Sequence, residues 1–346
     1  MPKVKDEVIP QPNWGPIGKD VFERTYSRAK PNGTKESWED TVNRVVQGNT
    51  KFVDAKFIEP NEVDELFNLF YNFKAIPAGR HLWVTGIPGR QFISNCWNSH
   101  WWPEFSRHFA FMFERLMEGG GVGSNYSNKY LKQYPVFKSP IELHFVCSPT
   151  HKDYAKLRTL LSKEYSHEWT GTISIADTRE GWVNGLSKVI DSVFNEEKTI
   201  IAFDLSQIRA EGEPIKSFGG TASGPVPLAT ALRNIAIKLN EFVGKKPTSI
   251  LCMEIDHEIG SCVIAGNVRR SARMSMKHWK DDDIFDFLTC KNLDKDGVAK
   301  AHWSTNISVV VDNQFFRKLK ERDSLAKKIA RLWAKGQLMN GEPGFY

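Results

Sequence analysis

Four glycines stand within five residues, at Gly119, Gly120, Gly121 and Gly123, and this run constrains the chain more than any other feature. The residues before it, 105–118, place apolar side chains at helical spacing, which predicts a helix that the glycines end. One glycine is enough to close a helix, so four indicate a backbone held close against another group, commonly a phosphate or a sugar. A glycine-rich turn without a ligand is the alternative.

A single cysteine lies just ahead of that helix. The apolar pair Phe92 and Ile93, bounded by polar residues, predicts a strand that carries Cys96 to an edge or a pocket. The alternative is a buried cysteine that fills space as a small apolar residue. Taken together with the glycine run, the thiol suggests a ligand site.

The composition is that of an ordinary folded protein. At 346 residues, with 40% apolar and 25% charged residues, the chain can form one large or two ordinary domains. No apolar run approaches the roughly 20 residues of a membrane span, and the first residues lack the apolar core of a signal peptide. We therefore expect a cytoplasmic protein with no membrane partner.

The charge and the cysteines narrow the classes further. The net charge of +6 is mild and spread along the chain, which favours anions such as nucleotides and gives no reason to expect nucleic acid. Five cysteines without a Cys-x-x-Cys pair predict free thiols and no structural metal site.

Two domains are expected, a helical one over residues 1–88 and an α/β one over 89–346. In the first, Ser37 with Asp40 three residues on predicts a capped helix, and a second helix is expected from Asn61. In the second, a strand near Ile173, a helix that includes Trp182 and a strand at 199–205 predict a parallel pair joined by a crossover helix.

Three further segments carry residue types suited to anions. Asp177 stands where a strand gives way to a helix, a place where α/β proteins put ligand groups, although a helix N-cap is the alternative. The loop at 219–224 offers backbone donors and hydroxyls, or is a solvated linker. Arg269 and Arg270 beside Asn267 can bind phosphate with paired donors, or form surface ion pairs.

The stretch 92–127 resembles the substrate-side signature of ribonucleotide reductase large chains. Residues 203–209, Phe-Asp-Leu-Ser-Gln-Ile-Arg, and 215–225, Ile-Lys-Ser-Phe-Gly-Gly-Thr-Ala-Ser-Gly-Pro, sharpen the resemblance to the adenosylcobalamin-dependent class, class II. The segments 22–28 and 76–83 resemble its monomeric, triphosphate-using members. The resemblance implies an α/β fold, in which an N-terminal helical domain is followed by the first part of the family's ten-stranded α/β barrel.

The resemblance also implies roles for individual residues. Cys96 would be one of two reducing cysteines that supply electrons to the ribose. The residues that would lie along the substrate are Ser94, Asn95, Gly119, Gly120, Gly121 and Gly123. A deoxynucleotide effector would be bound by Asp177, Arg179, Ser206 and Arg209. The loop that carries the effector's identity to the substrate would contain Asn267, Arg269 and Arg270.

One part of the family's chemistry is not found in the sequence. The radical loop has the pattern Asn-Pro-Cys-x-Glu, and none of Cys147, Cys252, Cys262 and Cys290 shows it. We therefore expect this polypeptide to be inactive alone and a companion polypeptide, separately encoded or joined by splicing, to supply the C-terminal part. A thioredoxin-type reductant would deliver electrons through that part.

The favoured hypothesis is one part of an enzyme that reduces ribonucleoside triphosphates with adenosylcobalamin as cofactor. The chain lacks the Asp-x-His-x-x-Gly pattern of other cobalamin proteins, so the cofactor is implied by the resemblance alone. Two alternatives stay open: a non-catalytic, nucleotide-binding regulatory fragment, and the large chain of another reductase class. A partner that carries Asn-Pro-Cys-x-Glu would distinguish the favoured hypothesis from the regulatory fragment.

Overall fold

The computed structural model describes residues 12–87, 93–215, 221–264, 272–292, 302 and 304–346. The chain forms two compact units, Met1–Ile93 and Ser94–Tyr346. Each unit has its own apolar core, and each is described by itself below.

The first unit is helical, as the sequence predicts for this region. Its elements are α1 (Gly18–Thr25), α2 (Trp38–Thr50), the 3-10 turn η1 (Ala55–Phe57), α3 (Glu62–Tyr71) and α4 (Gly79–Val84). The predicted capping box is confirmed, because Ser37 Oγ accepts the amide of Asp40 and the Asp40 carboxylate accepts the amide of Ser37. Trp38 joins two helices, since its indole Nε1 donates to the carbonyl of Tyr71 at 3.0 Å.

The second unit contains two parallel sheets. The larger sheet has the order β1-β2-β6-β7-β8, formed by Cys96–Ser99, Gly121–Asn125, Ala272–His278, Thr305–Val310 and Gly344–Phe345. The smaller has the order β3-β5-β4, formed by Ile141–Val146, Thr199–Asp204 and Ile173–Ser174. The predicted parallel pair is confirmed by β4 and β5, which are joined through helix α8 (Arg179–Asp191).

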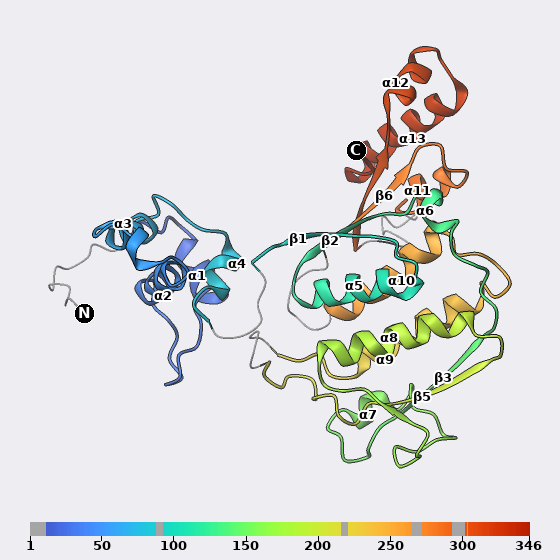
Figure 1. The fold of residues 1–346 in the computed structure, drawn as a ribbon, viewed down its shortest axis with the longest axis horizontal. Coiled ribbons are helices and arrows are strands. Elements are labelled where there is room, and N and C mark those ends of the chain that lie inside the picture. The colour runs from blue at the N-terminus through green and yellow to red at the C-terminus, as the bar shows by residue number, and fades with distance from the viewer. Residues whose placement is uncertain (1–11, 88–92, 216–220, 265–271, 293–301, 303) are drawn as a thin grey trace. The chain divides into compact units, whose positions relative to one another are not determined.

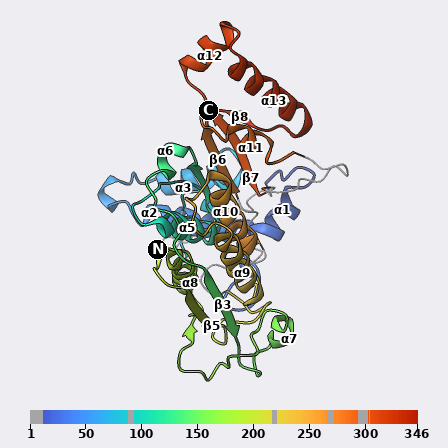
Figure 2. The ribbon, with the colours of Figure 1, turned by 90° about the vertical axis from the view of Figure 1, so that its right-hand side faces the viewer.

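Two layers of helices lie between the sheets (Figure 1). Helix α5 (Phe105–Met117) packs on α8 and on α10 (Ser249–Ile264), and α10 packs on α9 (Val226–Asn240), which reaches β3. The turned view shows the same succession of layers (Figure 2). The helical spacing predicted for α5 is confirmed, since Phe109, Met112, Phe113 and Leu116 are all buried in the common core.

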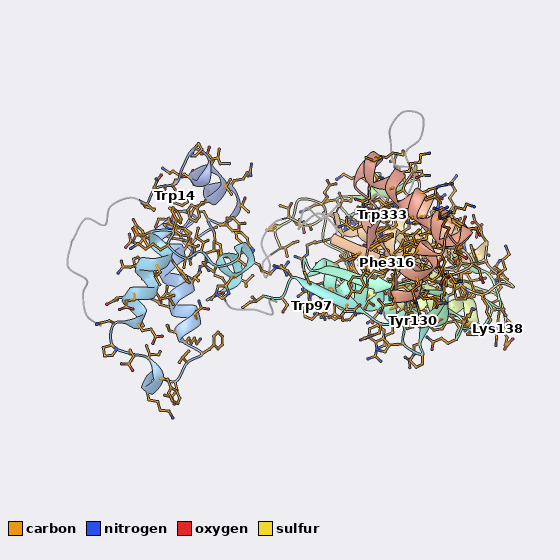
Figure 3. The ribbon with its side chains drawn as sticks, turned by 90° about the horizontal axis from the view of Figure 1, so that it is seen from above. Trp14, Trp97, Tyr130, Lys138, Phe316 and Trp333 are labelled. Carbon is orange, nitrogen blue, oxygen red and sulfur yellow. The ribbon has the colours of Figure 1, made fainter. Side chains whose placement is uncertain are left out.

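Smaller elements complete the second unit. They are α6 (Asn128–Leu131), α7 (Tyr154–Leu157), η2 (Ser192–Phe194), α11 (Ile284–Thr289), α12 (Asn313–Lys320) and α13 (Ser324–Asn340). Phe316 of α12 and Trp333 of α13 are labelled in Figure 3. The sequence predicts a single helix over 314–335, but Arg322 has a φ of +65° and Asp323 caps a new helix with its carboxylate. These two residues break the predicted helix.

Part of the glycine run lies in a strand and not in a turn. Gly121 and Gly123 belong to β2, which is hydrogen-bonded between β1 and β6. The strand predicted around Phe92 and Ile93 instead begins at Cys96, and Phe92 lies outside the described residues. No described helix is long and apolar enough to span a membrane.

Candidate functional site: a thiol-bearing sheet face and a nucleotide-sized pocket

Cys96 opens strand β1 at one edge of the larger sheet as described. The parallel register places it beside Gly121 of β2, which in turn lies beside Ala272 of β6. Residues in register share a face of a sheet, so the thiol borders two positions with little or no side chain. Cys96 is exposed, whereas Cys147, Cys252 and Cys262 are buried and Cys290 is half-buried. The alternative of a buried, space-filling Cys96 is therefore wrong.

The glycines next to Cys96 serve different purposes. Gly119 has a φ of +71° and closes α5, and its amide donates to the carbonyl of Leu116 at 2.8 Å. At Gly120 an added Cβ would lie 2.8 Å from the Trp97 ring, so close packing requires a glycine there. Gly121 and Gly123 have no side chains, so the sheet face beside the thiol is not obstructed at these two positions. The structure therefore brings Gly121 and Gly123 to the thiol's side, and accounts for Gly119 and Gly120 by helix ending and packing.

Ser94 and Asn95 lie directly before β1. Ser94 is exposed and Asn95 is half-buried. The Asn95 carbonyl accepts the amide of Gly121 at 2.6 Å, which ties the segment before the thiol to the start of β2. Both residues thus lie at the same end of the strand pair as Cys96.

The other face of this sheet is covered by α5 and α10. In β6 the buried positions are Arg273, Ser275 and Lys277, which alternate with the more exposed Met274 and Met276. Met274 is in register with Gly123 and shares the Cys96 face. In the described part of the chain, the Cys96 face is the less covered of the two.

A pocket of about 330 Å³ lies where α5, α8 and α10 approach the turn after β5. Three of the residues that the sequence predicts for an effector line it: Asp177, Arg179 and Arg209. Asp177 and Arg209 form an ion pair, with 2.6 Å between Oδ2 and Nε. The apolar part of the lining includes Met117, Trp182, Ile208, Ile215 and Val263. A lining with both charged and apolar side chains suits a nucleotide, which has charged phosphates and a flat, less polar base.

Asp177 is not the helix cap that the alternative proposed. The N-cap of α8 is Thr178, whose Oγ1 accepts the amide of Gly181 at 2.9 Å. The carboxylate of Asp177 is therefore left for Arg209 and for the pocket. Ser223 and Gly224 of the predicted anion loop also line the pocket, whereas Gly219 and Gly220 lie outside the described residues.

Ser206 does not reach this pocket. It lines a neighbouring hollow of about 410 Å³, which shares only Ile208 and Arg209 with the first. Its hydroxyl donates to Asp204 Oδ1 at 2.5 Å and accepts the amide of Ser148 at 2.7 Å. These bonds stabilise the turn after β5, a role that follows from its position two residues after Asp204.

The segment with Asn267, Arg269 and Arg270 lies outside the described residues. The elements that flank it are described: α10 ends at Ile264 and β6 begins at Ala272. Cys262 and Val263, near the end of α10, line the pocket. The roles of these three residues stay predictions. They follow a helix whose last turn lines the pocket.

A buried polar network beneath the sheet was missed by sequence reasoning. The Asp256 carboxylate accepts the hydroxyl of Tyr126 and lies 3.0 Å from His108 Nε2, and all three side chains are almost completely buried. Burial and the nearby Asp256 charge raise the pKa of Tyr126 well above its ordinary value. The sequence gave no signal for it, because its three members are far apart in the chain.

One described cluster has the spacing of metal ligands. The ligand atoms of Glu142, His144 and Glu164 lie within 4.8 Å of one another. The Glu142 carboxylate is ion-paired with Lys198, and His144 Nδ1 lies 2.9 Å from the Ser162 hydroxyl. Because lysine already supplies the positive charge, this cluster is accounted for as an ion-pair network on the smaller sheet.

Two protein-family models match the chain. "Ribonucleotide reductase alpha domain" covers residues 2–87, and "B12-dependent ribonucleotide reductase, insertion domain" covers residues 141–239. The second match contains β3, β4, β5, α8 and most of α9, and therefore much of the pocket. The described fold of both regions is consistent with these matches.

Relatives match nearly all of the chain. A protein of Mycobacterium phage D29, named provisionally as an adenosylcobalamin-dependent ribonucleoside-triphosphate reductase, is 44% identical over 354 residues, or 96% of this chain and 50% of that protein. The adenosylcobalamin-dependent ribonucleoside-triphosphate reductase of Levilactobacillus brevis is 35% identical over 96% of this chain and 48% of that protein. The corresponding protein of Lactobacillus leichmannii is 33% identical over 88% and 46%.

A solved structure agrees with these relatives. A crystal structure titled as a B12-dependent (class II) ribonucleotide reductase superimposes with a TM-score of 0.78 at 29% identity, over 96% of this chain and 49% of that one. The chain spans about half the length of the curated relatives it matches. By sequence and by fold, this chain belongs to the B12-dependent (class II) ribonucleotide reductases and corresponds to about half of such a protein.

Proposed function

We propose that this chain supplies a reducing thiol and an effector pocket to an enzyme that reduces ribonucleoside triphosphates to deoxyribonucleotides. The observation that carries the proposal is the register of Cys96 with Gly121, which places an exposed thiol on an open sheet face. The named activity of the relatives supplies the reaction class.

In this proposal the substrate lies on the Cys96 face. Two thiols close to a disulfide as the 2′-hydroxyl leaves as water, so that two hydrogens and two electrons are delivered to the nucleotide. Cys96 is one of the two thiols. The second thiol and the radical-bearing cysteine are proposed to belong to a companion polypeptide that carries the Asn-Pro-Cys-x-Glu pattern.

Adenosylcobalamin is proposed as the cofactor on the names of the relatives alone. The described residues around Cys96 form an open face and do not identify a place for a corrin ring. A thioredoxin-type reductant, acting through the companion polypeptide, would restore the thiols after each turnover.

The pocket is proposed to bind a deoxynucleotide effector. Arg209 and Arg179 supply cationic donors for phosphate, and Asp177 is placed to accept a sugar hydroxyl. Trp182 and the aliphatic wall suit the base. Asn267, Arg269 and Arg270 are proposed to lie between this pocket and the substrate.

The test is binding of each of the four deoxynucleoside triphosphates to the purified chain by equilibrium dialysis. Asp177→Asn should weaken binding by about tenfold, because it removes both the ion pair that orients Arg209 and a charged acceptor. Glu196→Gln, which alters an exposed ion pair with Lys138, is the matched control and should bind as the wild type does. Equal binding by Asp177→Asn and the control would remove the effector role from this pocket.

A non-catalytic regulatory fragment is the second candidate, and a specific observation favours it. The pocket is formed within this chain, whereas the radical-loop pattern is not. Capture of the chain from its source separates the two functions. A partner bearing Asn-Pro-Cys-x-Glu supports the reductase, and a chain that is recovered alone yet binds deoxynucleotides supports the fragment.

A further inference from the structure

Glu118 is a buried carboxylate at a helix end where its charge is unfavourable. It is the C-cap residue of α5, and its side chain is 3% exposed. The carbonyls at the end of a helix carry partial negative charge, so a carboxylate is disfavoured there unless cations compensate it. Two arginines do so. Arg115 Nη1 lies 2.6 Å from Oε2, and Arg179 Nη1 lies 3.5 Å from Oε1.

Arg179 connects Glu118 to the pocket. It is the first residue of α8, lines the pocket and is 29% exposed. Its 3.5 Å contact with Glu118 is longer than the 2.6 Å contact of Arg115, and is therefore the weaker of the two. A polyphosphate in the pocket would compete with Glu118 for the Arg179 guanidinium.

Arg115 connects Glu118 to both strands that carry the site. Its guanidinium lies over the Trp97 ring, 5.1 Å from the centroid, and Trp97 directly follows Cys96 in β1. Trp97 is labelled in Figure 3. The Arg115 carbonyl accepts the amide of Gly120 at 2.9 Å, and Gly120 directly precedes the register partner of Cys96. A shift of Arg115 would therefore move both Trp97, which follows Cys96 in β1, and Gly120, which precedes its register partner in β2.

We infer that Glu118 is a positioning residue that links the nucleotide pocket to Cys96 through Arg179, Arg115 and Trp97. The route runs through the end of α5, and all of its members lie in the described part of the second unit. The inference rests on the proposed function, since it takes a deoxynucleotide as the ligand of the pocket. Ligand binding draws Arg179 away from Glu118. The ion pair between Glu118 and Arg115 then changes, and with it the position of the Arg115 guanidinium over Trp97 in β1.

The first test compares Glu118→Gln with Glu114→Gln in the full chain. Glu114 also pairs with Arg115, at 3.0 Å, and no ion pair joins it to Arg179 in the described part of the chain, so it is a matched control. Deoxynucleoside triphosphates should bind about fivefold more tightly to Glu118→Gln, because Arg179 no longer has a competing carboxylate. A residue that served only to hold the fold together would weaken binding when replaced.

The second test measures the rate at which iodoacetamide alkylates Cys96, read from its peptide by mass spectrometry. In the wild type and in Glu114→Gln, saturating deoxynucleotide should change this rate by about fivefold. In Glu118→Gln the ligand should bind and leave the rate unchanged. Without ligand, the Cys96 rate of Glu118→Gln should already differ from that of the wild type.

The possible outcomes distinguish a failure of the proposed link through Glu118 from a failure of the proposed effector binding. If nucleotides bind the wild type but Cys96 responds equally in all three proteins, the link is overturned and the pocket stands. If no deoxynucleotide binds, the proposed effector site fails, and the ligand-free Cys96 rates decide whether Glu118 positions the thiol. If Glu118→Gln does not fold, Glu118→Asp keeps the charge on a side chain one methylene shorter, and a response of Cys96 to the ligand equal to that of the wild type would then overturn the link.

Discussion

Exposure sets Cys96 apart from the other cysteines. Burial raises the pKa of Cys147 to about 11 and that of Cys290 to about 12, and it also raises the pKa of Cys252 and Cys262. A thiol reacts as its thiolate, so these four groups are shielded both by position and by protonation. Cys96 is the one exposed member of the set.

Alkylation of the native chain should therefore be selective. At pH 8 iodoacetamide is expected to modify Cys96 at least about tenfold faster than any other cysteine. Peptide mass spectrometry over a time course measures the five rates separately. Denatured protein is the control, and there the five rates should converge. Comparable labelling of Cys147 in the native protein would contradict the described burial.

Buried His302 and half-buried His257 make the second unit sensitive to acid. Burial, with the Arg273 charge nearby, lowers the pKa of His257 to about 4, and burial with the His257 and Arg273 charges lowers that of His302 to about 4. His257 Nδ1 lies 2.8 Å from the Ser304 hydroxyl. Both imidazoles are thus held neutral in the folded chain at ordinary pH.

The free energy of unfolding should fall between pH 6.5 and pH 4. In the unfolded chain these histidines titrate near their ordinary value of about 6.5, so over this range the unfolded state binds more protons. The stabilisation is complete above about pH 6.5 and declines as the pH falls towards 4, by on the order of 3 kcal/mol for one histidine. Urea unfolding at pH 7 and pH 5 measures it. His257→Gln should show a smaller loss than His167→Gln, and equal losses would count against the assignment.

At the scale of elements, β1, the end of α5 and β2 act as one unit. The chain enters β1 at Cys96, leaves it at Ser99, runs through α5 and returns at Gly121 beside the thiol. Trp97 of β1 packs against Phe111 and Arg115 of α5. The glycines serve two purposes. Gly120, just before β2, allows close packing against Trp97, and Gly123, within β2, leaves the Cys96 face open.

Substituting these two glycines should separate stability from function. Gly120→Ala places a Cβ 2.8 Å from the Trp97 ring, and should lower the free energy of unfolding by about 1–3 kcal/mol. Gly123→Ala meets its nearest atom, Met274 Cβ, at 3.7 Å, an ordinary contact, and should leave stability nearly unchanged. Thermal unfolding of both variants gives the comparison. A large loss in Gly123→Ala would show that the Cys96 face is already filled.

At the scale of the whole molecule, the larger sheet is unfinished in the part that the structure describes. β1 and the two-residue β8 stand at its edges, and the face with Cys96 is covered less than the face under α5 and α10. Edge strands and open faces favour pairing with further chain. The proposed companion polypeptide is a candidate to cover this face.

Reconstitution is the prediction at this scale. The chain alone should not reduce ribonucleoside triphosphates, and the chain mixed with a captured partner bearing Asn-Pro-Cys-x-Glu, adenosylcobalamin and a dithiol should form deoxynucleotides. Product is measured by chromatography of labelled nucleotide. Cys96→Ser in the mixture is the control and should abolish multiple turnover. Turnover by the purified chain without a partner would sink the requirement for a companion.

Local sequence determined much of the secondary structure of this protein. The capping box at Ser37 and the apolar spacing of α5 depend on neighbouring residues, and both could be predicted because their hydrogen bonds and packing periods are local. The class II relation was carried by short segments such as 203–209. The break at Arg322 was missed because a helical pattern continues on both sides of one left-handed residue.

Only the tertiary structure decided how these segments meet. Cys96 and Gly121 are 25 residues apart, and their register follows from how α5 packs on α8 and α10. The pocket gathers Asp177, Arg209 and Val263 from three elements, and Ser206, expected among them, turns away because its hydroxyl is bound to Asp204. Glu118 gave no signal as an isolated acid at a helix end. Its proposed role depends on ion pairs with two arginines, one of which belongs to α8. Long-range packing of this kind leaves no local pattern in a sequence.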